Sequence, residues 1–515
     1  MTTTVTDVSP AGGTGTGAAV APAGGGWGAP PRGDQSAGAA TGVALVGAVV
    51  TTVNNFGLLF LVAHVGAVLA GLFFSATALV IVLGNSAGLG TMTGLVYFMP
   101  VARAAEPGPN PRGLVKVALG PVVVAGLLGG GLLLVAAPLV GDAIAGSRGH
   151  ELAQMLRVLS PAVPAWALTM SALGATRGLG SMVPTVAVQQ VGRPMGQLVG
   201  VGTVLLTTEH PPPWLVAAGW SVPVVAGAVA AVLILWREGG LVGSGPPPVP
   251  ASEFWRYTRP RSFATALQIA LERLDVVLVS ALAGPAVAGI YSALSRYITA
   301  GNFLVFSIGQ ACAPGLRRTL GGGEPVAGRR LLQQATGWMV MIVWPYLLAV
   351  AVKPDTFLGL ANPEFTGHGS ALTVLALFML ASSAAGPADL ALLMLGRSRA
   401  SLAAVALALA TDLVLAWLLV PRYGLMGAAL AWGLAVMAQN LTAATLVRLS
   451  SGTVSFGRPA LVAAVGAAGA VVPIGLSTPD TFTGLLVAAA VAGPLYLLWA
   501  ARWRRLLGLG SIGRR

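Results

Sequence analysis

Apolar segments long enough to cross a lipid bilayer follow one another along almost the whole chain. They restrict the fold more than any other feature, because a helix needs about 20 residues to cross roughly 30 Å of hydrocarbon. A soluble protein of 515 residues would need a more polar surface, since only 9% of these residues are charged and 55% are hydrophobic. The sequence therefore predicts an all-α polytopic membrane protein.

We count about 14 such segments, arranged as two blocks of six followed by two shorter ones. The first block comprises residues 41–65, 69–102, 112–140, 151–176, 181–208 and 213–236. The second block comprises residues 260–283, 286–316, 327–352, 366–395, 400–420 and 425–449. The shorter pair covers residues 459–476 and 482–501.

The segments and their flanks divide the chain into six parts. We expect a disordered cytoplasmic tail (1–40), an N-lobe of six helices (41–237), a cytoplasmic linker (238–259), a C-lobe of six helices (260–450), two extra helices (451–505) and a basic cytoplasmic tail (506–515). Residues 1–40 contain no basic stretch leading into a cleavable apolar core. They are therefore interpreted as a polar tail and not as a signal peptide.

The positions of the basic residues predict the orientation of the chain. If the N-terminus is cytoplasmic, 22 of the 29 lysines and arginines fall on the inside and the outside loops hold only Arg148, Lys353 and Arg422. The other four, Arg157, Arg193, Arg273 and Arg296, remain within spans. Inside loops of membrane proteins carry this excess. We therefore expect a multi-pass protein of the cytoplasmic (inner) membrane with both termini inside. The net charge of +13 is attributed to a membrane surface and not to nucleic acid.

The two blocks of six segments resemble each other. The stretch HVGAVLAGLFFSA around Gly66 and Gly71 matches LAGPAVAGIYSAL around Gly284 and Gly289, 218 residues later. An even number of spans per block gives both blocks the same orientation, so they are parallel repeats, which commonly hold a substrate site between them. Chance similarity between small residues is the alternative explanation in a chain rich in alanine and glycine.

Polar side chains lie inside several apolar segments, where they are costly unless they face a cavity or a partner. Residues 260–316 predict two helices joined by a Gly-Pro turn, with polar stripes at helical spacing that contain Gln268, Glu272, Asp275, Arg296 and Asn302. Arg273 lies off the stripe of its helix. Facing stripes of this kind predict a water-filled cavity.

The N-lobe has its own polar positions within the apolar segments. The fifth segment carries Gln189 and Arg193 on a stripe that repeats every four residues, and the first segment carries Asn54 and Asn55. For the two asparagines, hydrogen bonding between helices is the first interpretation and cavity lining the second. In the second segment, Gly84, Gly88, Gly90 and Gly94 indicate either a bend or close helix packing.

Several motifs resemble a known group of transporters. GIYSALSR after a short turn, PGLRRTL at the end of the following helix, LMLGRSRAS and LVPRYGLMGAALAW are similar to the polysaccharide-transporter (O-antigen flippase-like) branch of the multidrug/oligosaccharidyl-lipid/polysaccharide (MOP) flippase superfamily. The resemblance implies two six-helix lobes with two extra C-terminal helices. It also implies that the protein flips a polyprenyl-diphosphate-linked saccharide to the outer face of the membrane by alternating access.

This resemblance suggests roles for the buried polar residues. Arg193 and Arg296 would bind the diphosphate, because guanidinium groups pair well with phosphate oxygens; a structural ion pair is the alternative. Glu272 and Asp275, with Arg273 beside them, would couple transport to a proton or sodium ion, and a static salt bridge to Arg273 or Arg296 is equally compatible. Gln189, Asn302, Asn54 and Asn55 complete the expected substrate-binding set.

Other functions are less compatible with the sequence. It contains no GxxxxGK[ST] loop and no Cys/His metal spacing, so we expect neither an enzyme nor a cofactor. A MATE-type multidrug antiporter would need acidic residues in the N-lobe cavity, but the N-lobe spans contain no mid-membrane Asp or Glu. A lipid II flippase would need several arginines in the first two spans, and none occurs between residues 41 and 101. A non-transporting scaffold for a glycan assembly complex is the remaining alternative. The expected partners are the lipid-linked glycan, membrane lipid and a glycan polymerase or glycosyltransferase complex.

Overall fold

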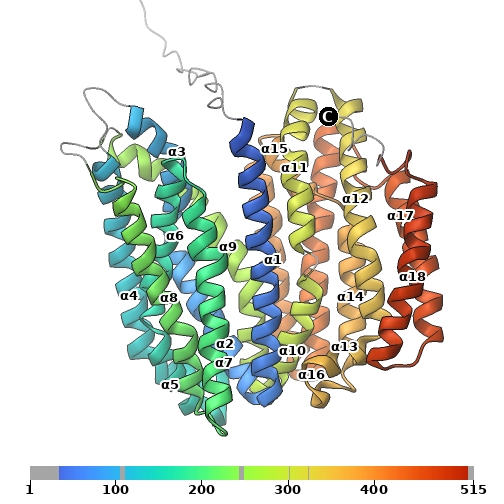
Figure 1. Cartoon of the computed structure of the whole chain (residues 1–515), viewed down its shortest axis with the longest axis horizontal. Coiled ribbons are helices and arrows are strands. Elements are labelled where there is room, and N and C mark those ends of the chain that lie inside the picture. The colour runs from blue at the N-terminus through green and yellow to red at the C-terminus, as the bar shows by residue number, and fades with distance from the viewer. Residues whose placement is uncertain are drawn as a thin grey trace, which may run out of the picture.

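The computed structural model in Figure 1 describes residues 34–104, 111–242, 247, 249–300, 302–322 and 324–508. Within these ranges, the side chains of residues 34–49, 101–104, 302–307, 310, 311, 321 and 325 are not described. All regular secondary structure in the described ranges is helical, and no strand occurs there. The predicted all-α fold is therefore confirmed.

The first half of the chain forms a bundle of long helices on one side of the molecule (Figure 1). These elements are α1 (Asp34–Val65), α2 (Ala67–Ala87), α3 (Thr91–Ala104), α4 (Pro111–Ala145), η1 (Gly146–Arg148), α5 (Gly149–Leu159), α6 (Ala162–Gly178), the π-helix η2 (Thr185–Gly192), α7 (Arg193–Thr207) and α8 (Pro213–Arg237).

The second half forms a matching bundle on the other side, with its last two helices at the outer edge (Figure 1). These elements are α9 (Ala251–Ala283), α10 (Pro285–Thr299), α11 (Asn302–Gly321), α12 (Pro325–Val352), α13 (Pro354–Ala361), η3 (Pro363–Phe365), α14 (Gly369–Ser383), α15 (Ala388–Met394), α16 (Ser398–Ser451), α17 (Arg458–Ser477) and α18 (Phe482–Arg502).

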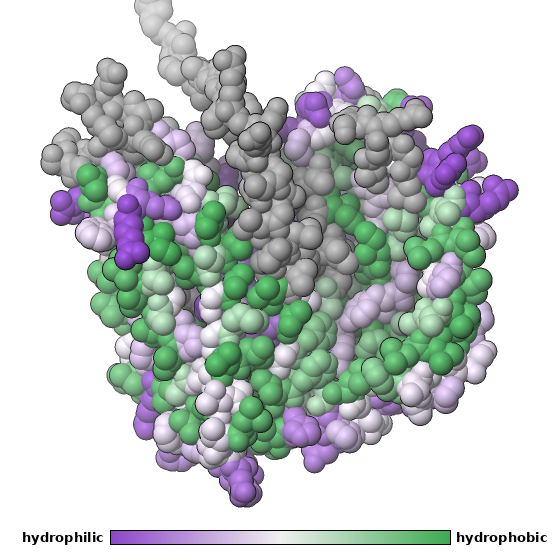
Figure 2. Space-filling view, viewed as in Figure 1, coloured by the Kyte–Doolittle hydropathy of each residue, from purple (hydrophilic) through white to green (hydrophobic). Residues whose placement is uncertain are grey.

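Membrane-length segments account for this architecture. Among the described residues, eight helical segments are long and apolar enough to cross a membrane by themselves. Other predicted spans contain shorter helices or carry charges, as α10 and α9 do. Helix α16 is two helices joined at Gly424, whose φ is 53°. Figure 2 shows apolar surface over the middle of the molecule and polar surface gathered at its two ends. This is the pattern of a multi-pass membrane protein with two six-helix lobes and two extra helices.

Two helices start earlier than the sequence predicted. α1 begins at Asp34, inside the segment expected to be a disordered tail, and α9 begins at Ala251, inside the expected linker. In α9 the extra turns pack against the N-lobe, since the ring of Tyr257 stacks on Tyr97 with 4.5 Å between centroids. Residues 1–33 and 509–515 lie outside the described residues.

The glycines of the second predicted span both break the helix and allow close helix packing, the two roles that the sequence suggested. The helix breaks between α2 and α3, where Leu89 and Gly90 have φ values of 48° and 66°. A Cβ atom on Gly84 would lie 2.8 Å from the side chain of Trp166, so this glycine allows close packing. The break therefore divides the predicted span into α2 and α3, and the close packing brings α2 against α6.

Helices α2 and α10 cross in close contact at the end of the molecule that carries α13. Gly66 and Gly284 precede these helices with φ values of 144° and 89°, so the 218-residue repeat is visible in the backbone. Two further bonds join the halves at this end: the Asn362 side chain donates to the carbonyl of Ala63 over 2.7 Å, and Ser280 donates to that of Ile144 over 3.2 Å. The sequence predicts that this end faces outward.

Candidate functional site

A cavity of about 700 Å³ lies between the two halves of the molecule. Its walls come from α1, α2, α6, α7 and α8 on one side and from α9, α10, α12, α14 and α16 on the other. A second space of about 330 Å³ adjoins it, and Arg193, Arg273 and Arg296 line both. The structure therefore brings together, in one place, mid-span arginines from both repeats.

Arg193 lies at the start of α7, in the wall formed by the N-lobe. The carbon of its guanidinium group is 4.1 Å from the ring centroid of Trp166 on α6, and Trp166 in turn stacks on Trp220 at 6.2 Å. A cation over an aromatic face is attracted by the electron-rich ring, most strongly when both are desolvated. Its Nε and Nη1 atoms are buried and have no hydrogen-bond partner among the described residues. The ring positions this arginine while leaving N–H groups free.

A π-helix places Arg193 in this position. The polar stripe was predicted from four-residue spacing, but Thr185–Gly192 form η2, whose wider turn rotates the residues before Arg193 away from those after it. Gln189 consequently lines the smaller space and accepts a 3.4 Å bond from Arg177, whereas Gln197 lines the main cavity and Arg193, between them, lines both. The stripe is divided between two surfaces because π geometry does not follow the α period.

Arg296 lies on α10, in the opposite wall. Its guanidinium carbon is 3.9 Å from the ring centroid of Phe74 on α2, and its Nη1 donates to the carbonyl of Ser292 over 3.4 Å. Among the described residues, neither Arg296 nor Arg193 has a carboxylate within salt-bridge distance. Arg193 is thus held by an aromatic ring and Arg296 by a ring and a backbone carbonyl, and their charges are not neutralised by an ion pair among the described residues.

The N-lobe wall offers more unsatisfied hydrogen-bond donors than acceptors. Buried donors without a partner among the described residues are Nε and Nη1 of Arg193, Nε2 of Gln197 and Nε1 of Trp166. The corresponding acceptors are Oδ1 of Asn54 and Oε1 of Gln190. Buried polar groups are normally satisfied, and each exception needs an explanation. A surface with surplus donors and a cation is complementary to a ligand that carries anionic oxygens.

The carboxylates of the site lie on the C-lobe side. Glu272 is exposed to the cavity and accepts a 2.8 Å bond from Gln268, one turn earlier on α9. Asp275 is only 6% exposed and accepts bonds from the backbone of Val276 at 2.8 Å and from the hydroxyl of Tyr291 at 3.0 Å. Neither forms an ion pair with Arg273 or Arg296 among the residues described, so the static salt bridge considered above is absent there.

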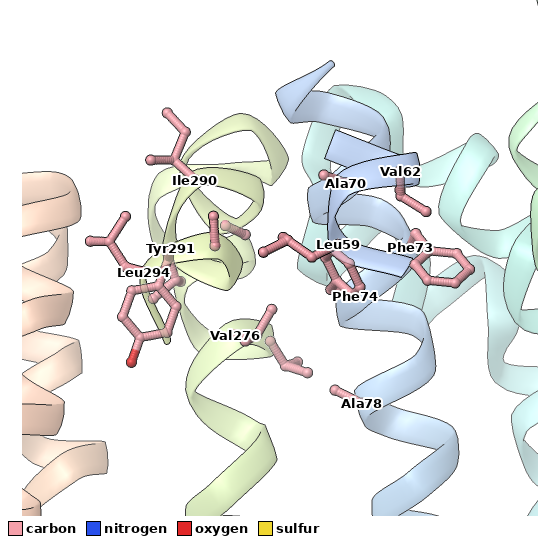
Figure 3. Close-up of a cluster of buried hydrophobic side chains, with 14 of the residues drawn as sticks. Leu59, Val62, Ala70, Phe73, Phe74, Ala78, Val276, Ile290, Tyr291 and Leu294 are labelled. Carbon is pink, nitrogen blue, oxygen red and sulfur yellow. The ribbon is translucent and has the colours of Figure 1, made fainter. Parts of the chain in front are cut away.

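Two residues next to Asp275 were not predicted as part of the site. Tyr291 is fully buried on α10, and its ring points away from α2 in Figure 3. Asp412 on α16 is 2% exposed and lies close enough to Asp275 and Tyr291 to interact with them electrostatically. The sequence offers a signal for Asp412, which is a lone carboxylate within an apolar segment. It offers none for Tyr291, since a tyrosine is common in apolar helices.

The remaining predicted residues have different positions. Asn54 and Asn55 line the main cavity, and Asn54 is buried. Arg273 is half-buried and lines both spaces. Asn302 begins α11, but its side chain lies outside the described residues. Sequence reasoning did not identify Trp166, Phe74 and the other cavity aromatics, because an aromatic residue in an apolar helix looks like ordinary core.

The fold and this cavity define a polytopic membrane protein built around a central polar site. Neither a protein-family model nor a curated protein matches the sequence. Solved structures do match in fold. The lipid II flippase MurJ in an inward closed conformation overlaps with a TM-score of 0.66 at 12% identity, covering 91% of this chain and 99% of MurJ.

Two transporters of the MOP superfamily match over somewhat less of the chain. An inward-facing multidrug resistance MATE family transporter gives a TM-score of 0.62 at 14% identity, with 78% of this chain and 94% of that one covered. A transporter from Pyrococcus furiosus, described as having a binding pocket of reverse polarity, gives 0.56 at 15% identity, with 80% and 94% covered. The chain therefore has the MOP-superfamily fold.

Proposed function

We propose that this protein is a membrane flippase that moves a polyprenyl-diphosphate-linked oligosaccharide or polysaccharide precursor from the inner to the outer face of the cytoplasmic membrane. One observation carries the proposal. Arg193 and Arg296 line the same cavity from opposite repeats, and neither has an ion-pair partner among the described residues. A buried cation without a counter-ion is costly, so a site that keeps two of them is suited to an anionic ligand.

The chemistry of the cavity fits the two parts of such a headgroup. Guanidinium groups bind phosphate oxygens through short, charge-assisted hydrogen bonds. The amide side chains of Asn54, Asn55, Gln197 and Gln439, which also line the cavity, can donate to and accept from sugar hydroxyls. The diphosphate would lie between the arginines and the first sugars along the amides, while the prenyl chain stays in lipid.

Alternating access supplies the mechanism. The headgroup enters the cavity from the side that the sequence predicts to be cytoplasmic. The two lobes then rock so that the contact between α2 and α10 opens and the other end closes. Glu272 and Asp275, with Arg273 beside them, adjust the electrostatic potential at Arg193 and Arg296. They also bind the proton or sodium ion that drives the movement of the lobes. No covalent chemistry is needed, so the protein acts without a cofactor.

A MATE-type antiporter for cationic drugs is a poorer fit to the cavity. The cavity-lining residues that come from α1 to α8 include Arg193 and no carboxylate. A cationic substrate would meet like charge on this wall, which disfavours binding. A scaffold without transport is also disfavoured, because it gives no role to a cavity of about 700 Å³ whose wall carries buried polar groups without a partner among the described residues.

Lipid II flipping is a second candidate, and one observation favours it. The overlap with MurJ covers 91% of this chain, whereas the overlap with the inward-facing MATE transporter covers 78%. Lipid II is itself a saccharide on a polyprenyl diphosphate, so the same arginines could serve it. Against it, the sequence has no arginine between residues 41 and 101. The two candidates differ in the sugar and not in the anion.

A strain that lacks this protein tests the proposal. We expect lipid-linked saccharide to accumulate on the cytoplasmic side of its membrane and to disappear from the outer face. Arg193→Glu should fail to complement the strain at normal expression, because the variant replaces the anion-binding charge with a repelling one. Restoration of export by Arg193→Glu, or an unchanged distribution of lipid-linked sugars in the deletion strain, would contradict the proposal. Accumulating lipid II would identify the second candidate.

A further inference from the structure

The two arginines of the cavity differ in where their aromatic partners come from. Arg193 on α7 lies over Trp166 on α6, so both members of that pair belong to the N-lobe. Arg296 belongs to the C-lobe, but its partner Phe74 lies on α2 of the N-lobe. Phe73 and Phe74 leave α2 in opposite directions, and Phe74 points toward the α9–α10 hairpin (Figure 3). Only the second pair therefore joins the two halves of the molecule.

The Arg296–Phe74 contact sits beside the closest approach of the two lobes. Phe74 is one helical turn after Gly71, and Arg296 is two turns after Gly289. At these glycines α2 and α10 touch through their backbones, so no side chain separates the helices. Helices α2 and α10 thus close this end of the molecule at their glycines. Two helical turns further along α10, Arg296 faces the cavity.

Anion binding and the aromatic contact compete for the same guanidinium group. A cation over a phenyl ring is held more weakly than one that donates charge-assisted hydrogen bonds to a phosphate. A diphosphate in the cavity would therefore draw Arg296 off Phe74. Because the ring and the arginine lie on different lobes, that movement removes a contact that holds α2 against α10.

We propose that Phe74 is a positioning residue that couples occupancy of the cavity to opening of the α2–α10 contact. It holds Arg296 toward the cavity when the site is empty. It thereby stabilises the state in which the end of the molecule that carries α13 is closed. When an anion takes Arg296, this stabilisation is lost and the closed end opens more readily. The inference rests on the proposed anionic substrate, and it assigns to an apolar residue a role in the transport cycle.

Distances across the closed end provide the test. The only cysteine of the sequence, Cys312, is replaced by serine, and spin labels are placed on His64→Cys and Ala286→Cys, which are exposed at the ends of α1 and α10. Double electron–electron resonance in nanodiscs then gives the fraction of molecules with the end open. The probe is farnesyl diphosphate, and farnesol is the control without the anion. In the otherwise unmodified protein, farnesyl diphosphate should raise the open fraction and farnesol should not.

Substitutions at Phe74 separate its role from general packing. Without ligand, Phe74→Leu should raise the ratio of open to closed molecules about fivefold, which corresponds to the loss of one weak cation–π contact. The same variant should show a smaller increase in open fraction when farnesyl diphosphate is added. Phe74→Tyr keeps the ring and should behave like the parent protein. Leu72→Val is the packing control, because Leu72 is buried on the same helix and does not line the cavity.

Each result has one interpretation. If Phe74→Leu has the same open fraction as Phe74→Tyr without ligand, the coupling role of Phe74 is wrong. The role is also wrong if Leu72→Val matches Phe74→Leu, since packing alone would then explain the shift. Calorimetric titration of farnesyl diphosphate on the same samples judges the proposed function separately. Absent binding would contradict the anionic substrate, while the ligand-free comparison would still decide whether Phe74 holds the end closed.

Discussion

Gly71 of α2 and Gly289 of α10 pack reciprocally against each other's helix. A Cβ atom on Gly71 would overlap the carbonyl oxygen of Pro285, and one on Gly289 would overlap that of Ala67. The two glycines are 218 residues apart in the sequence, and so are the two residues whose carbonyl oxygens they meet. The contact is therefore a local two-fold axis between the repeats, and it closes the end of the cavity that the sequence predicts to face outward.

Adding a methyl group at this contact should separate the helices. Gly71→Ala places a side chain against backbone, which cannot move aside, so we expect a loss of about 1–3 kcal/mol in stability of the closed state. Thermal unfolding in detergent and labelling of the closed end measure the effect. Gly289→Ala should match it, and the double variant should cost less than the sum because one separation relieves both overlaps.

Glycines elsewhere supply the control for that experiment. Gly120 and Gly131 lie within α4, where a Cβ atom would meet nothing within 4 Å. Alanine at either position should be neutral or stabilise the helix by up to about 1 kcal/mol. If Gly71→Ala behaved like these two variants, the closed α2–α10 contact would not be the packing arrangement that the protein uses.

Anion affinity should depend on Arg193 through its free N–H groups. Arg193→Gln should weaken binding of farnesyl diphosphate about 10–100-fold, which corresponds to one hydrogen bond to a charged group. Isothermal titration calorimetry measures this. Arg157→Gln is the matched control, since Arg157 is exposed at the end of α5 and does not line the cavity. Equal affinities for both variants would remove Arg193 from the binding site.

Trp166 should matter for the same binding through the position of Arg193. Trp166→Phe keeps an aromatic face under the guanidinium group and should retain most of the affinity for farnesyl diphosphate. Trp166→Leu removes the aromatic face and should bind farnesyl diphosphate more weakly. We expect the difference to be about fivefold, as for one cation–π contact. Titration of both variants with farnesyl diphosphate measures it, and no difference between them would mean that the ring does not position Arg193.

Ion coupling should depend on Asp275. Asp275→Asn keeps one oxygen to accept the bond from Val276 and gains an amino group that can donate to the Tyr291 hydroxyl, but it loses the charge. Transport should therefore no longer respond to an imposed proton or sodium gradient. Vesicle uptake under each gradient measures this. Asp389→Asn is the control, because Asp389 is bonded to Ser401 and does not line the cavity. Full gradient-driven transport by both Asp275→Asn and Glu272→Gln would exclude coupling through this pair.

The C-terminal helix pair should depend on Lys353. This side chain is 4% exposed, donates to the carbonyl of Thr478 and forms a 2.6 Å ion pair with Asp480. Lys353→Met should lower the stability by about 1.5–3 kcal/mol, because it removes bonds to a buried charge. Asp480→Asn should cost about 0–1 kcal/mol, since Asp480 is 77% exposed. Equal melting temperatures for the two variants would contradict this order.

Much of the fold could be predicted from the sequence, because membrane spans need long apolar segments and turns need particular residues. The turn at Gly284 and Pro285 lies between α9 and α10 as expected, and the repeat around Gly71 and Gly289 reappears as a reciprocal contact. Helix interruptions were less predictable. The π-helix before Arg193 depends on local backbone geometry that the apolar pattern does not encode.

The polar residues of the cavity could be predicted because they are costly in lipid. Their partners could not. Arg193 and Trp166, or Asp275 and Tyr291, lie on different helices, and periodicity gives the face of each helix but not the helix that it meets. The sequence therefore left salt bridges among Glu272, Asp275 and the nearby arginines open as an alternative to ion coupling. The described side chains instead place aromatic rings against Arg193 and Arg296.

Reconstituted flipping tests the central claim most directly. Liposomes carry a fluorescent polyprenyl-diphosphate saccharide in both leaflets, and dithionite added outside reduces only the outer pool. With the protein present, we expect nearly complete loss of fluorescence, while empty liposomes and those with Arg193→Glu or Arg296→Glu should lose only about half. A rate of loss equal to that of empty liposomes, or one that charge reversal of both arginines leaves unchanged, would contradict the assignment.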